Sequence, residues 1–232
     1  IVKFAKEKNL KIFVLGGGSN ILVSDQGFDG LVIHPTMTGI EKVSEDDKRV
    51  VLKFGAGENW DEAVAYSVDQ GWWGIENLSH IPGNSAAVVV QNVGAYGEEI
   101  SSVFKSVEVL DMETLKLKSL TRAECKFTYR HSIFNTTAKN RYIILSVTLE
   151  LSKKSNPILT YSDVKRYFEE NTSIEPTLLE IRKAIITIRD RKFPFPKNAV
   201  NGSAGSFFHG PIITKEKLEE IKEKIKNEFG DD

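Results

Sequence analysis

Residues 74–97 carry glycine, proline and asparagine so densely that neither a long helix nor a long strand can run through them. Pro82 and Gly83 break any helix that reaches them, and only Ala86 to Gln91 is expected to extend, as a strand. Glycine lacks a Cβ atom, so a ligand or a neighbouring chain segment can lie directly against its peptide plane. We therefore expect the backbone here to contact a ligand or another part of the chain closely.

A second glycine-rich turn, Leu15–Asn20, follows directly after the apolar run Ile12–Leu15. Backbone N–H groups in such turns bind phosphate oxygens well. Two turns of this kind in one small protein indicate a large ligand that carries phosphates. Their spacing matches neither the G-x-G-x-x-G fingerprint nor a Walker loop, which argues against the Rossmann and P-loop interpretations.

The charge balance narrows the possible partners. The 232 residues include 31 basic and 32 acidic side chains, a net charge of −1, which argues against a general binder of nucleic acids or membrane surfaces. No apolar run approaches the roughly 20 residues of a membrane span. The one cysteine, Cys125, excludes an internal disulfide and fits a reducing compartment. No signal peptide precedes Ile1, which reads as mid-helix, so we expect a trimmed or partial chain of a cytoplasmic protein.

Hydrophobic patterning predicts a mixture of helices and strands. The first half should contain a short helix ending near Asn9, strands at 11–15, 21–23, 31–33 and 49–54, and a helix from an Asn59 N-cap to about Gln70. The second half should contain a hairpin of 106–110 with 115–120, a Thr121-capped turn up to Cys125, and a strand at 142–151. Two helices should follow, one from Thr177 with an apolar face of Leu178, Ile181, Ile185 and Ile188, and an amphipathic one at 215–229. The pattern predicts an α+β protein.

Four residues are candidates for chemistry, and the first two are Ser206 and Arg130. Ser206 ends a glycine loop, where a serine is usually a turn residue or a cap. No Gly-x-Ser-x-Gly elbow is present, so the alternative role is that of a proton donor. Arg130 follows Tyr129, and an arginine in such a segment is more often a structural salt-bridge partner than a substrate clamp.

Other candidates have ordinary structural explanations. Lys192 would place a positive charge at the carboxyl end of a helix, and Tyr161 would be a half-buried packing residue. The four histidines show no metal-ligand spacing and the cysteine has no partner ligand, so we expect no metal site.

Eight segments, in order, resemble the family of UDP-N-acetylenolpyruvoylglucosamine reductases, flavoenzymes that make UDP-N-acetylmuramate for peptidoglycan. They are LGGGSNILVSD, GAGENWDEAV, ENLSHIPG, QNVGAYG, YRHSIFN, LTYSD, IRDRKFPFP and GSAGSFF. The resemblance covers nearly the whole chain. It implies an α+β fold with a two-part FAD-binding cradle of the PCMH/VAO type and a smaller α+β substrate-binding domain. The implied divisions are 1–37 and 38–155 for the two FAD-binding parts, the first of them partial, and 156–232 for a partial substrate-binding domain.

The resemblance also implies roles for individual residues. Arg130 would steady the substrate carboxylate and the developing enolate, with Tyr129 beside it. Ser206 would protonate the carbanion after flavin N5 has delivered hydride, and Tyr161 and Lys192 would bind the UDP portion or the closing lid. FAD would contact Leu15, Gly16, Gly17, Gly18, Ser19, Asn20, Gly55, Gly57, Ile81, Pro82, Gly83, Gln91, Asn92, Gly94, Ala95, Tyr96 and Gly97.

The implied partners are FAD, NADPH as the electron donor, and the UDP-sugar. NADPH would reduce the flavin first and leave before the sugar enters. We expect a cytoplasmic monomer without nucleic-acid or membrane partners, serving peptidoglycan synthesis and through it cell shape and division.

The sequence departs from the family pattern in several places. Ala86 and Val89 replace a glycine and a proline, and an added methyl group there is expected to clash or to require an unfavourable φ, at about 1–2 kcal/mol. His209 and Gly210 follow Phe208 where the family has lysine and asparagine, and the stretch 197–200 is about two residues longer. The N-terminal lead-in and the C-terminal segment, which supplies a glutamate of the enolate-stabilising set, are expected to be missing.

Two alternatives remain open on sequence grounds. The chain could be another flavoenzyme of the same cradle fold, with His80 as the one candidate for a covalent flavin tether. It could also be a binding module that keeps the cradle and has lost the chemistry, as the departures at Ala86, Val89 and Gly210 would suggest.

Overall fold

The computed structural model describes residues 1–170, 175–192 and 210–230. It consists of two compact units, Ile1–Arg191 and Lys192–Asp232. The helices are α1 Val2–Glu7, α2 Trp60–Asp69, α3 Ser85–Val90, α4 Ile100–Val103, α5 Arg122–Cys125, α6 Ser162–Glu170, α7 Leu178–Lys192 and α8 Lys215–Phe229, with 3-10 turns η1 Glu76–Leu78 and η2 Ile133–Asn135. The strands are β1 Ile12–Val14, β2 Leu31–Ile33, β3 Ile40–Glu45, β4 Arg49–Gly55, β5 Gly94–Ala95, β6 Glu98–Glu99, β7 Phe104–Asp111, β8 Lys116–Thr121 and β9 Tyr142–Ser152.

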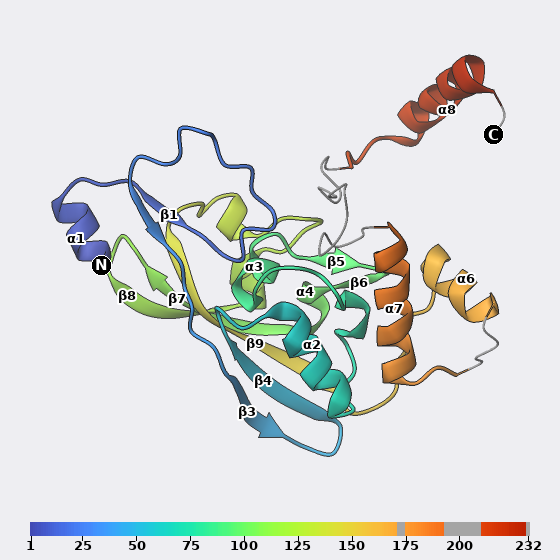
Figure 1. Cartoon of the computed structure of the whole chain (residues 1–232), viewed down its shortest axis with the longest axis horizontal. Helices are drawn as coiled ribbons and strands as arrows, with labels where there is room; N and C mark the ends of the chain where they lie inside the picture. The colour runs from blue at the N-terminus through green and yellow to red at the C-terminus, as the bar shows by residue number, and fades with distance from the viewer. Residues whose placement is uncertain (171–174, 193–209, 231–232) are drawn as a thin grey trace. The chain divides into compact units, whose positions relative to one another are not determined.

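The first unit is built on a five-stranded sheet of order β3-β4-β9-β7-β8, in which all neighbours are antiparallel. The 11-residue strand β9 lies between β4 and β7 (Figure 1). Its apolar side chains meet those of both neighbours, with Leu149 opposite Leu52 and Val147 opposite Val107. The strands predicted at 49–54, 106–110, 115–120 and 142–151 are confirmed.

Helices α2 and α3 lie against one face of this sheet and bury the main core with it (Figure 1). The indole N–H of Trp60, a fully buried residue, donates to the carbonyl oxygen of Leu78 at 2.9 Å. The predicted N-cap is confirmed, since Asn59 Oδ1 accepts from the N–H of Glu62 at 3.1 Å. The core also holds Cys125, whose thiol is fully buried, and burial raises the pKa of Cys125 to about 12.

A smaller core lies under α1 and the parallel pair β1–β2. It is centred on Val2, Met112 and Ile143, so the N-terminal elements pack at the β7–β8 end of the sheet. The strand predicted at 21–23 is wrong, because residues 21–23 form no strand with the described parts of the chain and Leu22 is 88% exposed. The strand predicted at 11–15 forms as β1, and its residues are half-buried.

The strand predicted at 86–91 is also wrong, since Ser85–Val90 forms helix α3. Asn84 Oδ1 caps the helix by accepting from the N–H of Ala87 at 3.0 Å. The carbonyl oxygens of Glu58 and Ala56 accept from the first two N–H groups of the helix. These contacts, with burial of Val88 and Val89 in the core, override the strand preference of three consecutive valines.

The carboxyl-terminal helices follow the apolar pattern of the sequence. Thr177 caps α7 reciprocally with Glu180, and the predicted apolar face of the helix is buried. Helix α8 spans the predicted residues, and none of its residues is buried. The predicted stop at Pro194 and Pro196 lies outside the described residues, and the domain divisions at 37/38 and 155/156 stay a prediction. Among the described helices, none is long and apolar enough to cross a membrane.

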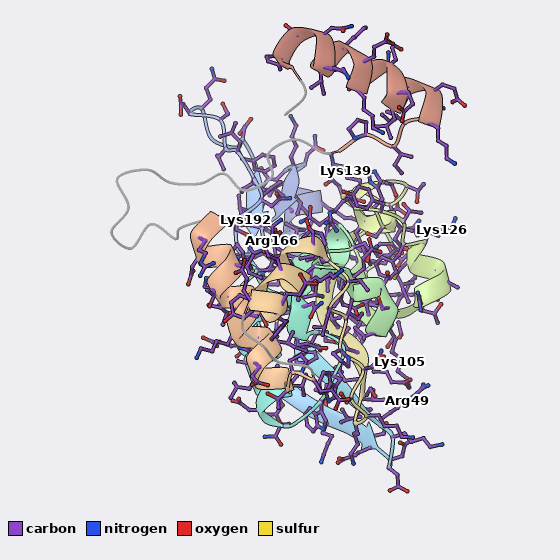
Figure 2. All side chains as sticks on the ribbon, turned by 90° about the vertical axis from the view of Figure 1, so that its right-hand side faces the viewer. Arg49, Lys105, Lys126, Lys139, Arg166 and Lys192 are labelled. Atoms are coloured by element: carbon purple, nitrogen blue, oxygen red, sulfur yellow. The ribbon has the colours of Figure 1, made fainter. Side chains whose placement is uncertain are left out.

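Basic side chains extend from several elements of the first unit (Figure 2). Arg49 on β4 and Lys105 on β7 both pair with Glu150 on β9, which lies between these strands. The three side chains remain between 29% and 64% exposed, so the pairs contribute little to stability.

Asp111 makes the most extensive buried polar contact of the sheet. Its Oδ2 accepts from Lys118 Nζ at 2.7 Å and from Arg141 Nη2 at 3.0 Å, and its Oδ1 accepts from the N–H of Glu113 at 2.9 Å. The hydrogen bonds from Arg141 and Lys118 hold the pKa of Asp111 well below its ordinary value.

We expect Asp111→Asn to lower the free energy of unfolding at pH 7 and to lower it by less in acid. Folding lowers the pKa of Asp111, so its stabilising contribution is complete above the unfolded value of about 3.9 and is lost as the pH falls toward the folded value. The urea midpoints of the two proteins should therefore differ by a constant amount down to about pH 5 and begin to approach one another as the pH falls to about 3. Glu169→Gln, in the exposed Lys165–Glu169 pair, serves as the control. A difference that does not depend on pH would contradict the assignment.

Candidate functional site

The two glycine-rich turns meet at the start of helix α3. A Cβ atom on Gly17 would lie 2.8 Å from Cα of Gly83, and one on Gly16 would lie 3.3 Å from Cβ of Ala87. The backbones therefore approach more closely than side chains would allow. We call residues 15–20 and 81–84 together the glycine cluster.

Side chains also link the two parts of the glycine cluster to each other and link the cluster to the end of α3. Ser19 Oγ donates to the carbonyl oxygen of Pro82 at 3.3 Å. Asn20 Nδ2 donates to Gln91 Oε1 at 2.9 Å, at the far end of α3. These two hydrogen bonds join residues that are 63 and 71 positions apart in the sequence. Ser19, Asn20, Pro82 and Gln91 all belong to the predicted FAD-contacting set.

The glycine cluster presents backbone donors that the chain does not use. Within residues 1–170, 175–192 and 210–230, the N–H groups of Gly16, Gly17, Gly18, Gly83 and Asn84 donate to no acceptor. Gly17 and Gly18 are exposed, and Gly18 and Gly83 have left-handed backbones. Convergent N–H groups of this kind match the acceptor oxygens of a phosphate group.

The Gly55–Gly57 turn adjoins this cluster from β4. Ala56 O accepts from the N–H of Ala86 at 3.1 Å, which holds the turn against α3. A Cβ atom on Gly55 would lie 2.4 Å from the carbonyl oxygen of Met37, and one on Gly57 would lie 2.7 Å from Cα of Thr36. The two glycines therefore make room for the chain at 36–39.

The segment from Gln91 to Gly97 forms the small β5–β6 hairpin with the residues after it. Asn92 is buried, and its Nδ2 donates to Glu99 Oε2 at 2.9 Å and to the carbonyl oxygen of Thr128 at 3.0 Å. Its Oδ1 accepts from the N–H of Ser101 at 3.1 Å. The Asn92 side chain thus holds the segment in place from within the protein.

Arg130 lies against this hairpin. Its Nη2 donates to the carbonyl oxygen of Gly94 at 2.5 Å and its Nη1 to that of Asn92 at 3.4 Å. The guanidinium carbon is 5.0 Å from the centre of the Tyr129 ring. A side chain on Gly94 would crowd this site, because its Cβ would lie 2.9 Å from the carbonyl oxygen of Glu98 and 2.7 Å from Arg130 Nη1. We call Asn92, Gly94, Tyr129 and Arg130 the arginine cluster.

The charge on Arg130 is not neutralised by the described parts of the chain. No carboxylate among residues 1–170, 175–192 and 210–230 pairs with it, so the salt bridge that its sequence context favours is not made there. Its backbone is left-handed, with φ of 58°, and Asn135 Nδ2 donates to its carbonyl oxygen at 3.1 Å. An arginine held in a strained turn without a carboxylate partner is suited to bind an anion.

The remaining predicted residues lie at separate places. Tyr161, at 45% exposure, packs edge-on against Tyr96 with ring centres 5.3 Å apart. Lys192 is the last residue of α7, where a positive charge suits the helix dipole. Ser206 lies outside the described residues, and so does His209. Ala95 is in β5 and half-buried, next to the arginine cluster.

Two carboxyl groups are buried near the hairpin. Glu76 in η1 is 3% exposed and Glu98 in β6 is 7% exposed. Burial raises the pKa of both, and the proximity of Glu98 raises that of Glu76 further. Asn77, between them in sequence, donates to the carbonyl oxygens of Tyr96 and Ile158 at 2.8 Å each. It thereby joins the hairpin to the chain that leads to α6.

The departures at Ala86 and Val89 are accommodated. Ala86 is in the first turn of α3 and is absent from the described non-glycine residues with positive φ. Val89 is fully buried in the main core. The expected need for an unfavourable φ at Ala86 is therefore wrong. Gly210, in the second unit, is exposed.

Sequence reasoning did not identify Asn135, Asn77 or the surroundings of His80. Asn135 could have been found, because Ser132 and Asn135 form a reciprocal cap with the spacing of a capping box. No local spacing signals the contacts of Asn77 or of His80, whose ring Nε2 lies 2.9 Å from Asp190 Oδ1 on α7. His80, considered above as a flavin tether, thus contacts α7 through its ring.

Within the described residues, no cluster of three metal-ligating side chains occurs.

Comparisons with known proteins agree with the geometry. A family model described as FAD binding domain matches residues 1–115. The UDP-N-acetylenolpyruvoylglucosamine reductase of Flavobacterium johnsoniae is 43% identical over 221 residues, which are 95% of this chain and 65% of the relative. The reductases of Amoebophilus asiaticus and Pseudomonas putida are 45% and 40% identical, covering 92% and 94% of this chain. The chain thus spans less than two thirds of the length of these relatives.

A solved structure shows the same fold. The UDP-N-acetylenolpyruvylglucosamine reductase of Thermus caldophilus aligns with a TM-score of 0.60 at 24% identity, covering 95% of this chain and 70% of that one. The predicted α+β fold of the FAD-cradle type is confirmed.

Proposed function

The chain belongs to the family of UDP-N-acetylenolpyruvoylglucosamine reductases, and from that premise we propose that the protein reduces UDP-N-acetylenolpyruvoylglucosamine to UDP-N-acetylmuramate with FAD and NADPH. The observation that carries the proposal is identity of 37–45% to named reductases along about nine tenths of the chain. The product is a precursor of peptidoglycan, so the reaction belongs in the cytoplasm. We propose a monomer that acts without nucleic-acid or membrane partners.

The residues present fit FAD. The unused N–H groups of Gly16, Gly17, Gly18, Gly83 and Asn84 are suited to the pyrophosphate, and the close backbones leave the peptide planes accessible. The other proposed contacts are Leu15, Ser19, Asn20, Gly55, Gly57, Ile81, Pro82, Gln91, Asn92, Gly94, Ala95, Tyr96 and Gly97. Bound in this set of residues, FAD would supply the hydride-transfer chemistry between NADPH and the substrate double bond.

Arg130 is proposed to stabilise negative charge on the substrate. Its guanidinium donates only to two neutral carbonyl oxygens within the described chain. It can therefore donate to a carboxylate or an enolate oxygen without first breaking an ion pair. Tyr129 packs beside the guanidinium and limits its orientations.

Ser206 is proposed to donate the proton that completes the reduction. Tyr161 and Lys192 are proposed to bind the UDP portion, through the phenol ring and the ammonium charge. The roles of Ser206, Tyr161 and Lys192 rest on the resemblance of GSAGSFF, LTYSD and IRDRKFPFP to the family's segments.

The visible absorbance spectrum of the purified protein, before and after addition of FAD, tests the function. We expect a bound flavin band that bleaches with NADPH and returns when the enolpyruvyl sugar is added. A flavin that binds but does not respond to the sugar would indicate another flavoenzyme or an inactive remnant. A protein that does not bind FAD would refute the proposal.

A further inference from the structure

His80, the residue before the Ile81–Gly83 turn, is held by its backbone from two directions. Its φ is 60°, in the left-handed region that a side chain disfavours. Its N–H donates to Asp61 Oδ1 on α2 at 2.5 Å, and its carbonyl oxygen accepts from Arg189 Nε on α7 at 2.8 Å. Both polar groups of one strained peptide residue are thus used by helices that are distant in sequence.

Asp61 is itself fixed by α7. Arg182 Nη1 and Nη2 donate to its Oδ1 and Oδ2 at 2.6 and 2.9 Å, a bidentate pair in which Arg182 is 13% exposed. Burial favours the neutral carboxyl, but the hydrogen bonds from Arg182 and the His80 N–H outweigh it and lower the pKa of Asp61. The carboxylate is therefore charged at neutral pH, and its geometry is set by the planar guanidinium.

The turn beyond His80 is anchored at its other end as well. Gly83 O accepts from the N–H of Trp60 at 3.2 Å, and Gly83 is the residue that faces Gly17 across the glycine cluster. Between these two anchors, the turn has little freedom to shift. Its two ends set where the donors of Gly83 and Asn84 point.

We propose that Asp61, Arg182 and Arg189 position the 81–84 turn for the flavin, so that α7 sets the affinity of the cradle. We call these three residues the His80 clamp. That the ligand is FAD rests on the proposed function. The three clamp residues are positioning residues, which act on the turn without contacting FAD. The imidazole of His80, although close to Asp190, has no part in the proposal, because the clamp acts through the backbone.

The experiment measures two quantities in parallel: the affinity for FAD, and the protection of backbone N–H groups at the turn from hydrogen exchange. Asp61→Ala removes the acceptor of the His80 N–H and the partner of Arg182, and we expect the FAD dissociation constant to rise about tenfold, as loss of one charge-assisted hydrogen bond produces. Asp61→Asn keeps an acceptor for the N–H and should have a smaller effect. His80→Gly keeps both backbone contacts in a residue that adopts positive φ readily, and should leave the dissociation constant within about twofold of wild type.

Glu150→Ala is the matched control, because Glu150 also pairs with two cations but lies in the sheet away from the turn. Hydrogen exchange of the Trp60 and Ser85 N–H groups, which donate to the carbonyl oxygens of Gly83 and Glu58 at the far end of the turn, should accelerate in FAD-free Asp61→Ala and remain unchanged in FAD-free Glu150→Ala. An Asp61→Ala protein that binds FAD as wild type does, or retains the protection of the turn, would overturn the clamp. If wild type binds no FAD, the proposed function fails, and the exchange data still decide whether the clamp holds the turn.

Discussion

Ser206→Ala is expected to lower sugar-dependent reoxidation of the flavin by about 10²–10⁴-fold, the range in which a positioned general acid contributes. FAD should still bind and NADPH should still bleach it, because the serine acts only after hydride has reached the substrate. Stopped-flow absorbance separates these steps: the reductive phase should match wild type, and the oxidative phase with the enolpyruvyl sugar should be slow.

Ser203→Ala is the matched control for that experiment, since Ser203 belongs to the same glycine- and serine-rich stretch of sequence and is given no part in the chemistry. Its oxidative phase should be unchanged. If Ser206→Ala turns over at the wild-type rate, Ser206 is a turn residue and the proton comes from another group.

Arg130→Ala is expected to raise the KM for the sugar and to lower kcat by about 10²–10³-fold, as loss of one donor to a developing oxyanion typically does. The guanidinium would bind the carboxylate in the ground state and the enolate in the transition state, so both constants should change. Arg122→Ala provides a control, because Arg122 is exposed on α5.

Arg130→Ala also removes the hydrogen bonds to the carbonyl oxygens of Asn92 and Gly94, which hold the guanidinium against the hairpin. Arg130→Lys keeps the positive charge but not the planar fork of donors. We expect partial recovery of KM with little recovery of kcat. Unchanged KM in Arg130→Ala, together with weaker FAD binding, would instead assign Arg130 a structural role.

The sequence predicted the large elements because their burial is periodic. Strand β9 alternates apolar residues between partners on both sides, and α7 places Leu178, Ile181, Ile185 and Ile188 on one face. Edge strand β3 was not predicted, because five of its six residues are exposed and carry little apolar signal. Three valines in α3 and the apolar run at 21–23 misled the prediction, because backbone partners and burial decided both segments.

The candidate site was predictable to a similar degree. Glycine indicated where backbones meet, and Gly17 and Gly83 do meet. Two facts could not be read from a single sequence: that Arg130 donates to backbone carbonyl oxygens, and that Arg182 reaches Asp61 across 121 positions. Both depend on how separate segments approach one another, and no local spacing records this.

Because Cys125 is buried, the rate at which its thiol is chemically labelled reports how often the surrounding core opens. The thiolate is the form that reacts with alkylating probes, and a pKa near 12 in a fully buried site leaves almost none of it available while the core is intact. Because no other cysteine competes, the rate of labelling measures how often the core around α5 opens. Measured with and without ligand, that rate would reveal how far occupation of the cradle tightens the sheet beneath it.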